Sequence, residues 1–209
     1  MSGMTYRPIT DTWILGRCKH GYHGGFAVGF LERARELLPV TSDEGIWHFC
    51  SGRVQDYKGK VGGIPLKGFS KNDLTFDVNA NVKPDFVVDL RHLDEWAVDS
   101  TRVSFYYYFD KSGTKLKFVA RPRAILIDRP YDEENHNEYV KRYGCPPGTL
   151  PNPNELVRQA LRIVQPGGRV AMLDFVHPRP GKNFKETAIV NVHVGQGTRP
   201  RILTVWKER

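Results

Sequence analysis

The sequence predicts an α/β domain with a mostly parallel central sheet that closes in a C-terminal antiparallel pair of strands. The expected early strands are short and almost wholly apolar, and helices or long loops separate them. This pattern is typical of parallel strands that are buried on both faces. The last two expected strands instead alternate apolar and polar residues across a short, glycine-containing connection at residues 195–198, which favours an antiparallel pair.

The composition is that of a globular chain with a basic balance. The chain has 209 residues, of which 40% are hydrophobic and 26% are charged. This favours one domain, in which residues 1–44 form an N-terminal extension with a helix and residues 53–73 form a basic loop insertion. The formal charge of +8 suits an anionic partner, for which we expect nucleic acid, although many basic proteins bind no such partner.

Cysteine usage and hydropathy predict the compartment. The three cysteines, Cys18, Cys50 and Cys145, are an odd and low count, which favours a reducing environment. The first eleven residues contain no apolar signal segment. No apolar run approaches the roughly 20 residues that cross a bilayer. We therefore expect a cytoplasmic protein without a membrane segment.

The expected elements follow from local patterns. Strands are expected where short apolar or alternating runs are bounded by turn residues, at 45–50, 74–78, 86–90, 124–127, 169–175, 187–194 and 202–206. Helices are expected at 30–38, ahead of Pro39, and at 154–164, capped by Asn152 or Asn154. Residues 103–109 and 116–120 suggest a hairpin, although the first run also fits the end of a helix. Residues 1–25 look irregular, and 53–73 look like a long loop.

Polar side chains follow four successive expected strands. In strand order they are Ser51 and Gly52, then Asp77 and Asn79, then Asp89, and finally Asp128. In open α/β sheets, ligands bind beyond the carboxyl ends of the strands. A carboxylate after the second strand can accept hydrogen bonds from a ribose diol, and one after the third can receive an adenine amino group. Each acid alone is equally explained as a helix cap, so their serial placement is what favours a nucleoside site.

Four short segments resemble those of a known superfamily. Residues 128–131 (Asp-Arg-Pro-Tyr) resemble the Asp-Pro-Pro-Tyr motif of the amino-methyltransferases that modify adenine or cytosine in DNA. Residues 166–169 (Pro-Gly-Gly-Arg) resemble the segment that precedes the fifth strand in S-adenosylmethionine-dependent methyltransferases with a Rossmann-like fold. Residues 23–26 (His-Gly-Gly-Phe) and 48–52 (His-Phe-Cys-Ser-Gly) are similar to segments of small phage and bacterial methyltransferase-like proteins. The resemblance covers roughly residues 45–209.

The resemblance implies a cofactor and a set of site residues. The cofactor would be S-adenosylmethionine, held by His48, Cys50, Ser51, Gly52, Asp77, Asn79, Asp89 and Leu90. The catalytic residues would be Asp128, Pro130 and Tyr131. The substrate-binding residues would be His23, Gly24, Gly25, Phe26, Arg53, Lys58, Lys60 and Arg129.

The implied chemistry agrees with the residue types. An arylamine lone pair is delocalised into its ring, so an acid and a backbone carbonyl that accept the amine protons would localise it toward the methyl donor. A tyrosine ring stacked on a flipped base would contribute about 1–3 kcal/mol. The implied function is methylation of an exocyclic amine of a base in DNA. A DNA enzyme of this size without a separate target-recognition domain would fit a homodimer or an accessory protein.

Two departures from the family pattern leave alternatives open. Arg129 replaces a proline and could either bind a phosphate or carboxylate or block an adenine pocket. The expected glycine-rich loop is reduced to Ser51-Gly52. One alternative is a methyltransferase of a small anionic metabolite or nucleotide, because Arg121, Arg123 and Arg129 are expected near one end of a strand. The other is an inactive methyltransferase-like protein that binds nucleic acid or protein.

A zinc site is the less favoured interpretation of the histidine and cysteine residues near the N-terminus. The candidates are Cys18, His20, His23, His48 and Cys50. Each close pair is separated by a single residue, whereas structural zinc ligands are usually separated by two to four. A buried strand and a glycine-rich loop explain these residues better, and we expect no metal.

Overall fold

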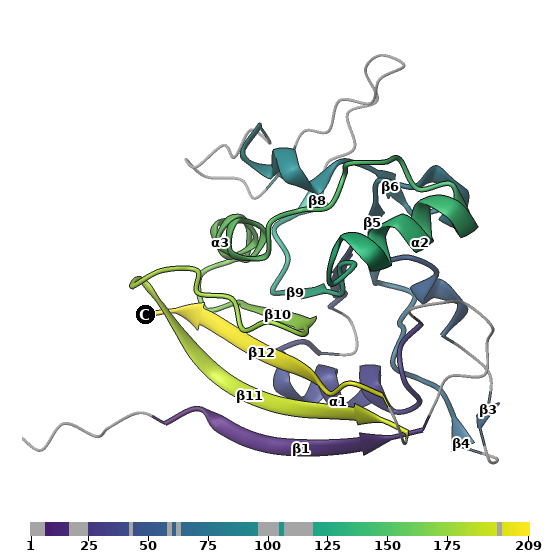
Figure 1. The fold of residues 1–209 in the computed structure, drawn as a ribbon. Coiled ribbons are helices and arrows are strands. Elements are labelled where there is room, and N and C mark those ends of the chain that lie inside the picture. The colour runs from purple at the N-terminus through teal and green to yellow at the C-terminus, as the bar shows by residue number, and fades with distance from the viewer. Residues whose placement is uncertain are drawn as a thin grey trace, which may run out of the picture.

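The computed structural model describes residues 7–16, 25–41, 44–57, 60–61, 64–95, 105–106, 119–195 and 198–209. Its centre is an eight-stranded sheet with the order β1-β11-β12-β10-β9-β2-β5-β6 (Figure 1). The strands are β1 (Ile9–Leu15), β2 (Trp47–Phe49), β5 (Leu74–Asp77), β6 (Phe86–Val87), β9 (Ala124–Ile127), β10 (Arg169–Asp174), β11 (Phe184–Val194) and β12 (Arg201–Glu208). β12 is antiparallel to both of its neighbours, and the other pairs in this sheet are parallel. The predicted Rossmann-like α/β class is therefore confirmed.

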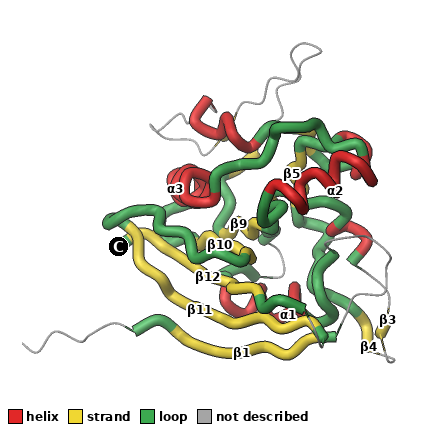
Figure 2. The backbone as a smooth tube through the Cα atoms, viewed as in Figure 1, coloured by secondary structure: helices red, strands yellow, loops and turns green. Residues whose placement is uncertain are grey.

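Three α-helices, three 3₁₀ helices and two small sheets complete the described part of the chain (Figure 2). The helices are α1 (Phe30–Leu37), α2 (Glu133–Tyr143), α3 (Pro153–Ile163), η1 (Val54–Asp56), η2 (Ala80–Val82) and η3 (Leu90–Glu95). The small sheets pair β3 (Lys60–Val61) with β4 (Ile64–Pro65) and β7 (Phe105–Tyr106) with β8 (Val119–Ala120). None of the described helices has the length and apolarity needed to cross a bilayer.

The sheet separates two apolar clusters, and alternate residues of a strand join opposite clusters. In β9, Leu126 packs in the cluster that contains α1, whereas Ile125 and Ile127 pack in the cluster that contains α3. This alternation is the two-residue period of a strand. β9 is fully buried because both of its faces are covered, which explains why its sequence is a continuous apolar run.

The helix boundaries follow from local capping. Asn152 accepts hydrogen bonds from the backbone N–H groups of Asn154 and Glu155, and Pro153 occupies the first turn of α3. Asp132 caps α2 in the same way, and Gly144 ends that helix with a φ of 67°. A side-chain acceptor satisfies N–H groups that have no partner within the helix, and glycine adopts the left-handed conformation at little cost.

The predicted helices and sheet strands are confirmed, with differences at their ends, but one strand of the central sheet and one α-helix were not predicted. Residues 1–25 were expected to be irregular, but β1 extends the sheet by pairing with β11. In β1 only Trp13 and Leu15 are buried, and Ile14 is 82% exposed. An edge strand with so few buried residues gives a weak sequence signal. α2 was also missed, because it buries only His136 and has little apolar periodicity.

The predicted loop and hairpin regions have some structure of their own. The segment at 53–73 contains η1 and the β3–β4 pair. The expected hairpin at 103–120 is described only at Phe105–Tyr106 and Val119–Ala120, which are antiparallel partners. Its expected turn at 110–113 lies outside the described residues.

Candidate active site

A pocket lies where the strand order of the sheet reverses. From β2 the chain adds β5 and β6 on one side, and it later adds β9 and β10 on the other side of β2. The carboxyl ends of β2 and β9 therefore diverge into separate loops, and such a switch point is where open α/β sheets bind ligands. The pocket is lined by residues from the loops that follow β2, β5, β6 and β9, together with α2 and two further segments.

The loops after β2 and β5 are joined by one carboxylate. The Asp77 side chain accepts hydrogen bonds from the backbone N–H of Gly52 (2.8 Å to Oδ2) and from that of Asn79 (2.9 Å to Oδ1). Cys50 and Gly52 both have positive φ, at 52° and 50°. The turn after β2 thus folds back over the end of β5. Burial raises the pKa of Asp77 above its ordinary value, against the effect of these N–H donors.

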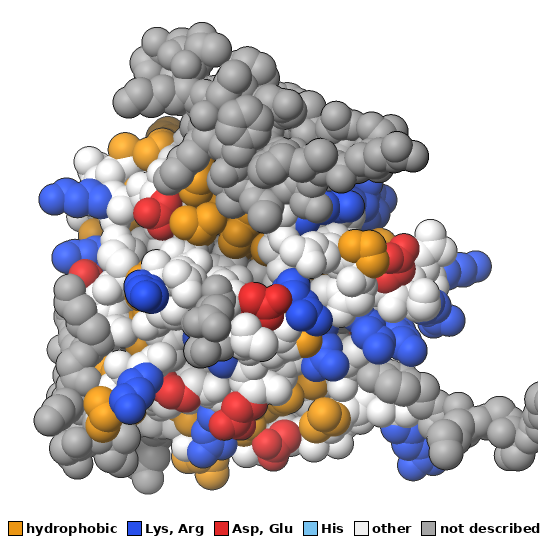
Figure 3. All heavy atoms as spheres, turned by 180° about the vertical axis from the view of Figure 1, so that it is seen from behind, with side chains coloured by type: hydrophobic (Ala, Val, Ile, Leu, Met, Phe, Trp, Pro, Cys, Tyr) orange, Lys and Arg blue, Asp and Glu red, His pale blue; other side chains and the backbone are white. Residues whose placement is uncertain are grey.

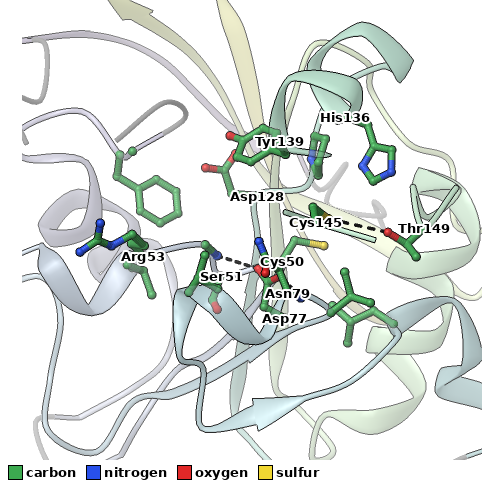
Figure 4. Close-up of a pocket in the computed structure, with 18 of the residues that line it drawn as sticks. Cys50, Ser51, Arg53, Asp77, Asn79, Asp128, His136, Tyr139, Cys145 and Thr149 are labelled. Carbon is green, nitrogen blue, oxygen red and sulfur yellow. Dashed lines mark hydrogen bonds between the residues drawn. The ribbon is translucent and has the colours of Figure 1, made fainter. Parts of the chain in front are cut away.

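Asp128 places a second carboxylate on the pocket wall at the end of β9 (Figure 4). Its Oδ1 accepts a hydrogen bond from the Tyr131 hydroxyl (3.0 Å), and Nη1 of Arg201 lies 4.0 Å from the same oxygen. Burial raises the pKa of Asp128 to about 6, although Arg201 and the Tyr131 hydroxyl both act to lower it. This carboxyl group therefore changes charge close to neutral pH.

Arg129 does not line the pocket. Its Nε lies 2.9 Å from Oδ2 of Asp174, and its Nη1 donates to the carbonyl of Pro130 (2.7 Å). The side chain is buried, so the guanidinium is held inside the protein. The prediction that Arg129 either binds an anionic substrate or blocks an adenine pocket does not agree with this placement.

Tyr131 also takes a different place from the one that the motif implied. Its ring packs against Phe175, with ring centroids 4.4 Å apart, and its hydroxyl contacts Asp128 and Arg201. The ring is not among the groups that line the pocket. In this conformation it offers no stacking face to a ligand there, contrary to the prediction. Pro130 lines the pocket, and its assignment as a catalytic residue stays a prediction.

Two of the predicted cofactor residues lie away from the pocket. His48 is buried against Phe69, and its Nε2 lies 3.1 Å from Oδ2 of Asp73. Asp73 also accepts from Arg35 and from the N–H of Ile46, so this cluster ties α1 to β2. Asp89 pairs with Arg91. Neither His48 nor Asp89 contacts the pocket, whereas Leu90, next to Asp89, does.

The remaining predicted cofactor and substrate residues divide into three groups. Those that line the pocket are Cys50, Ser51, Gly52, Asp77, Asn79, Gly25, Phe26 and Arg53. His23, Gly24 and Lys58 lie outside the described residues, and the side chain of Lys60 is not described. Arg53 is exposed and pairs with Asp56 (2.8 Å). The roles assigned to these residues stay predictions.

The basic residues near β9 do not gather at one end. Arg121 donates to the carbonyls of Ile163 and Arg162, and Arg123 pairs with Glu44. Both precede β9, whereas Arg129 follows it, so they lie at opposite ends of the strand. The expected cluster of three arginines is wrong.

Several pocket residues were not predicted, and four of them carry polar side chains from α2 and the segment after it. His136 and Tyr139 come from α2, and Cys145 and Thr149 come from the segment that follows it. Figure 4 shows His136, Cys145 and Thr149 grouped together, with Asp77 and Asn79 beside Cys50 and Ser51. His136 is 2% exposed, and neither ring nitrogen has a hydrogen-bond partner in the part of the chain that the structure describes. The sequence signal for His136 is weak, because His136 is a polar residue in a helix with little apolar periodicity.

Among the described residues, the pocket offers carboxylates, backbone groups and the Cys50 thiol. Within the described ranges, no three His, Cys, Asp or Glu side chains are arranged to hold a metal ion. Cys18, His20 and His23 lie outside those ranges. Burial raises the pKa of the Cys50 thiol well above its ordinary value, and Asp77 raises it further. The thiol is therefore neutral and a poor nucleophile.

Comparisons with known proteins find similarities among solved structures, two of which follow. No protein-family model matches the chain, and no curated protein matches it. The structure of TrmN from Thermus thermophilus has a TM-score of 0.47 and 12% identity, covering 88% of this chain. An rRNA methylase from Streptococcus thermophilus has a TM-score of 0.40 and 16% identity, covering 85% of this chain and 93% of the methylase. The chain spans about half the length of TrmN, at 49%. These values are too low to transfer an activity, a substrate or a residue's role.

Proposed function

We propose that this chain is an S-adenosylmethionine-dependent methyltransferase that acts on the exocyclic amine of a base in DNA. The observation that carries the proposal is the shared position of two carboxylates. Asp77, tied to the turn after β2, and Asp128, at the end of β9, line one pocket at the switch point of the sheet. Asp77 is suited to accept hydrogen bonds from a nucleoside, and Asp128 is suited to accept the proton of an acceptor amine.

The residues around the pocket fit the proposed cofactor. Asp77 would accept hydrogen bonds from ribose hydroxyls, because each of its oxygens has a further lone pair beyond the N–H that it already binds. Among the described residues, the Ser51 hydroxyl and both His136 nitrogens are buried without hydrogen-bond partners, and both residues line the same pocket as Asp77. A buried polar group without a partner is costly, and a polar ligand would satisfy it. When bound, the cofactor would supply an electrophilic sulfonium methyl group.

Asp128 would prepare the acceptor amine. Oδ1 is engaged by Tyr131, whereas no hydrogen bond from the described residues reaches Oδ2. An amine N–H that donates to Oδ2 would turn its lone pair out of conjugation and toward the methyl group. The carboxylate of Asp128 would take up the amine proton when the nitrogen gains the methyl group and the C–S bond of the cofactor breaks. A group with a pKa of about 6 suits this role near neutral pH.

No structural observation favours the small-anion alternative over a base. That alternative depended on Arg129, whose guanidinium is bound by Asp174 and by backbone carbonyls. Among the described residues, the aromatic rings of Phe26, Tyr57 and Tyr139 line the pocket, and a base can stack on such rings.

Methyl transfer from labelled S-adenosylmethionine tests the proposal. DNA, RNA and free nucleotides are offered separately, and the products are digested to identify the modified base. We expect label in an exocyclic amine of DNA. Label in nucleotides or RNA alone would overturn the proposed substrate, and binding of S-adenosylhomocysteine without transfer to any acceptor would overturn the proposed activity.

Binding to DNA is expected to weaken steeply with salt if basic side chains contact the phosphate backbone. Each phosphate neutralised releases counterions, which gives a slope of about −0.9 per contact in log affinity against log salt. Figure 3 shows one face on which the Lys and Arg side chains of the described residues lie dispersed among acidic ones. Fluorescence anisotropy between 50 and 300 mM salt measures the slope, estimated to exceed about 3 in magnitude. A flat response would exclude a backbone-contacting role.

Replacing His136 by phenylalanine is expected to raise the stability of the ligand-free protein and to lower its affinity for the ligand. The substitution removes two buried nitrogens that have no hydrogen-bond partner among the described residues, so the ligand-free protein should gain about 1 kcal/mol in stability. The same change removes a polar contact for the ligand, so affinity for S-adenosylhomocysteine should fall about 5-fold. Thermal denaturation and calorimetry measure the two effects. Lower stability with unchanged affinity would show that His136 belongs only to the packed interior.

A further inference from the structure

Tyr131 and Arg201 form a chain of contacts that ends on Asp128. The Tyr131 hydroxyl donates to Oδ1 of Asp128 at 3.0 Å, and Nη1 of Arg201 donates to the Tyr131 hydroxyl. The guanidinium carbon of Arg201 also lies 5.7 Å from the centroid of the Tyr131 ring. Arg201 is the first residue of β12, 70 positions away from Tyr131 in the sequence. The two side chains therefore join the loop after β9 to the antiparallel strand.

These contacts are built into the protein interior. Arg201 is 9% exposed overall, and its side chain and that of Asp128 are each 11% exposed. The Tyr131 ring is held in place by Phe175 on β10's C-terminal side. Burying a cation and a carboxylate costs free energy unless hydrogen bonds or ion pairs satisfy each charged group. Here the Tyr131 hydroxyl bridges the two groups. The arrangement fixes Oδ1 of Asp128, whereas Oδ2 accepts no hydrogen bond from the described residues.

We propose that Tyr131 and Arg201 are positioning residues, which hold Asp128 by Oδ1 so that Oδ2 faces the acceptor amine. This inference rests on the proposed function. It gives Tyr131 a role other than base stacking, and it assigns a functional role to the C-terminal strand. Neither side chain touches the acceptor; both act through Asp128.

The other charged groups near Asp128 come from neighbouring elements. Asp174 on β10 raises the pKa of Asp128, but Arg129 engages Asp174 and offsets its charge. The Cys50 thiol after β2 is neutral because burial raises its pKa. Arg201 is therefore the cation that most directly favours the ionised form of Asp128, with the Tyr131 hydroxyl as the second contribution. Their removal should shift the ionisation of Asp128 upward.

The test compares the Tyr131→Phe, Arg201→Met and Arg201→Lys variants with the wild type. Carbon NMR of the labelled Asp128 carboxyl group, assigned with Asp128→Asn, gives its pKa whether or not methyl transfer occurs. We expect upward shifts of about one unit or more for Arg201→Met, a smaller shift for Tyr131→Phe, and recovery toward wild type for Arg201→Lys. The pH profile of kcat should move by the same amount. Arg142→Met, on the exposed face of α2, is the matched control and should change neither value.

The outcomes separate the inference from the proposed function. A pKa of Asp128 that is unchanged in both Tyr131→Phe and Arg201→Met, in folded protein, would overturn the positioning role even if methyl transfer is observed. Equal loss of kcat at every pH would also overturn it, because that pattern indicates a purely structural effect. If the NMR titrations shift but the protein transfers no methyl group, the contacts of Tyr131 and Arg201 with Asp128 would be supported. The proposed function would then be overturned, and with it the role of these residues in positioning Asp128 for catalysis.

Discussion

Replacement of Asp128 by alanine is expected to lower kcat for methyl transfer by about 10²- to 10⁴-fold, the usual contribution of a positioned proton acceptor. Asp128 lies on the pocket wall, and one of its oxygens has no partner among the described residues. Affinity for S-adenosylhomocysteine should change little, because the proposed function assigns cofactor binding to Asp77, which is hydrogen-bonded to the turn after β2, and not to Asp128. Radiolabel transfer under saturating cofactor measures kcat, and calorimetry measures the affinity.

The pH dependence of the same reaction gives a sharper form of this prediction. Asp128 has a pKa of about 6, raised by burial, so the accepting carboxylate is protonated below that pH and ionised above it. Wild-type kcat should therefore rise with pH through about 6 and level off above it. Asp128→Asn keeps a hydrogen-bond acceptor but cannot ionise, so its lower activity should show no inflection near pH 6. An inflection that persists in Asp128→Asn would assign the titration to another group.

Replacement of Asp77 by alanine is expected to weaken the binding of S-adenosylhomocysteine about 10- to 100-fold. This is the effect of losing one or two hydrogen bonds to a charged group, at about 1.5–3 kcal/mol in total. The change also releases the N–H groups of Gly52 and Asn79, which Asp77 holds at 2.8 and 2.9 Å. Turnover at saturating cofactor should be much less affected, because the proposed function assigns Asp77 to the cofactor and Asp128 to the acceptor.

Asp89→Ala is the matched control for the Asp77 experiment. Both acids follow neighbouring parallel strands, but Asp89 is bound to Arg91 and does not line the pocket. The structure predicts an unchanged dissociation constant for Asp89→Ala, whereas the sequence pattern alone assigned both acids to the cofactor. Equal losses in the two variants would favour the assignment from sequence, and no loss in Asp77→Ala would remove Asp77 from the site.

The strands and the edge of the sheet that holds the pocket could be predicted from sequence because they depend on local patterns. Continuous apolar runs such as that of β9 indicate strands buried on both faces, and the residue after each run must lie at the carboxyl edge. This is why Ser51, Asp77 and Asp128 were expected at one edge, where the structure places them. The edge strand β1 was missed because its exposed residues include Ile9 and Ile14, which break the pattern of burial.

The directions of individual side chains could not be predicted, because they depend on partners that are distant in the chain. Arg129 turns inward because Asp174, on β10, is buried beside it. Tyr131 turns toward Arg201 and Phe175 for the same kind of reason. His48 faces Asp73 rather than the pocket, because alternate residues of β2 face opposite sides of the sheet. A motif of four residues indicates where a site lies, but its long-range contacts determine which of its side chains face the ligand.

A co-crystal structure with S-adenosylhomocysteine tests the central claim most directly. The account predicts that the ribose hydroxyls lie within hydrogen-bond distance of Asp77 and that the sulfur is directed toward Oδ2 of Asp128. Calorimetry under the same conditions should show one binding site per chain. A ligand bound elsewhere on the molecule, or no binding at all, would contradict the assignment of this pocket to a methyl donor.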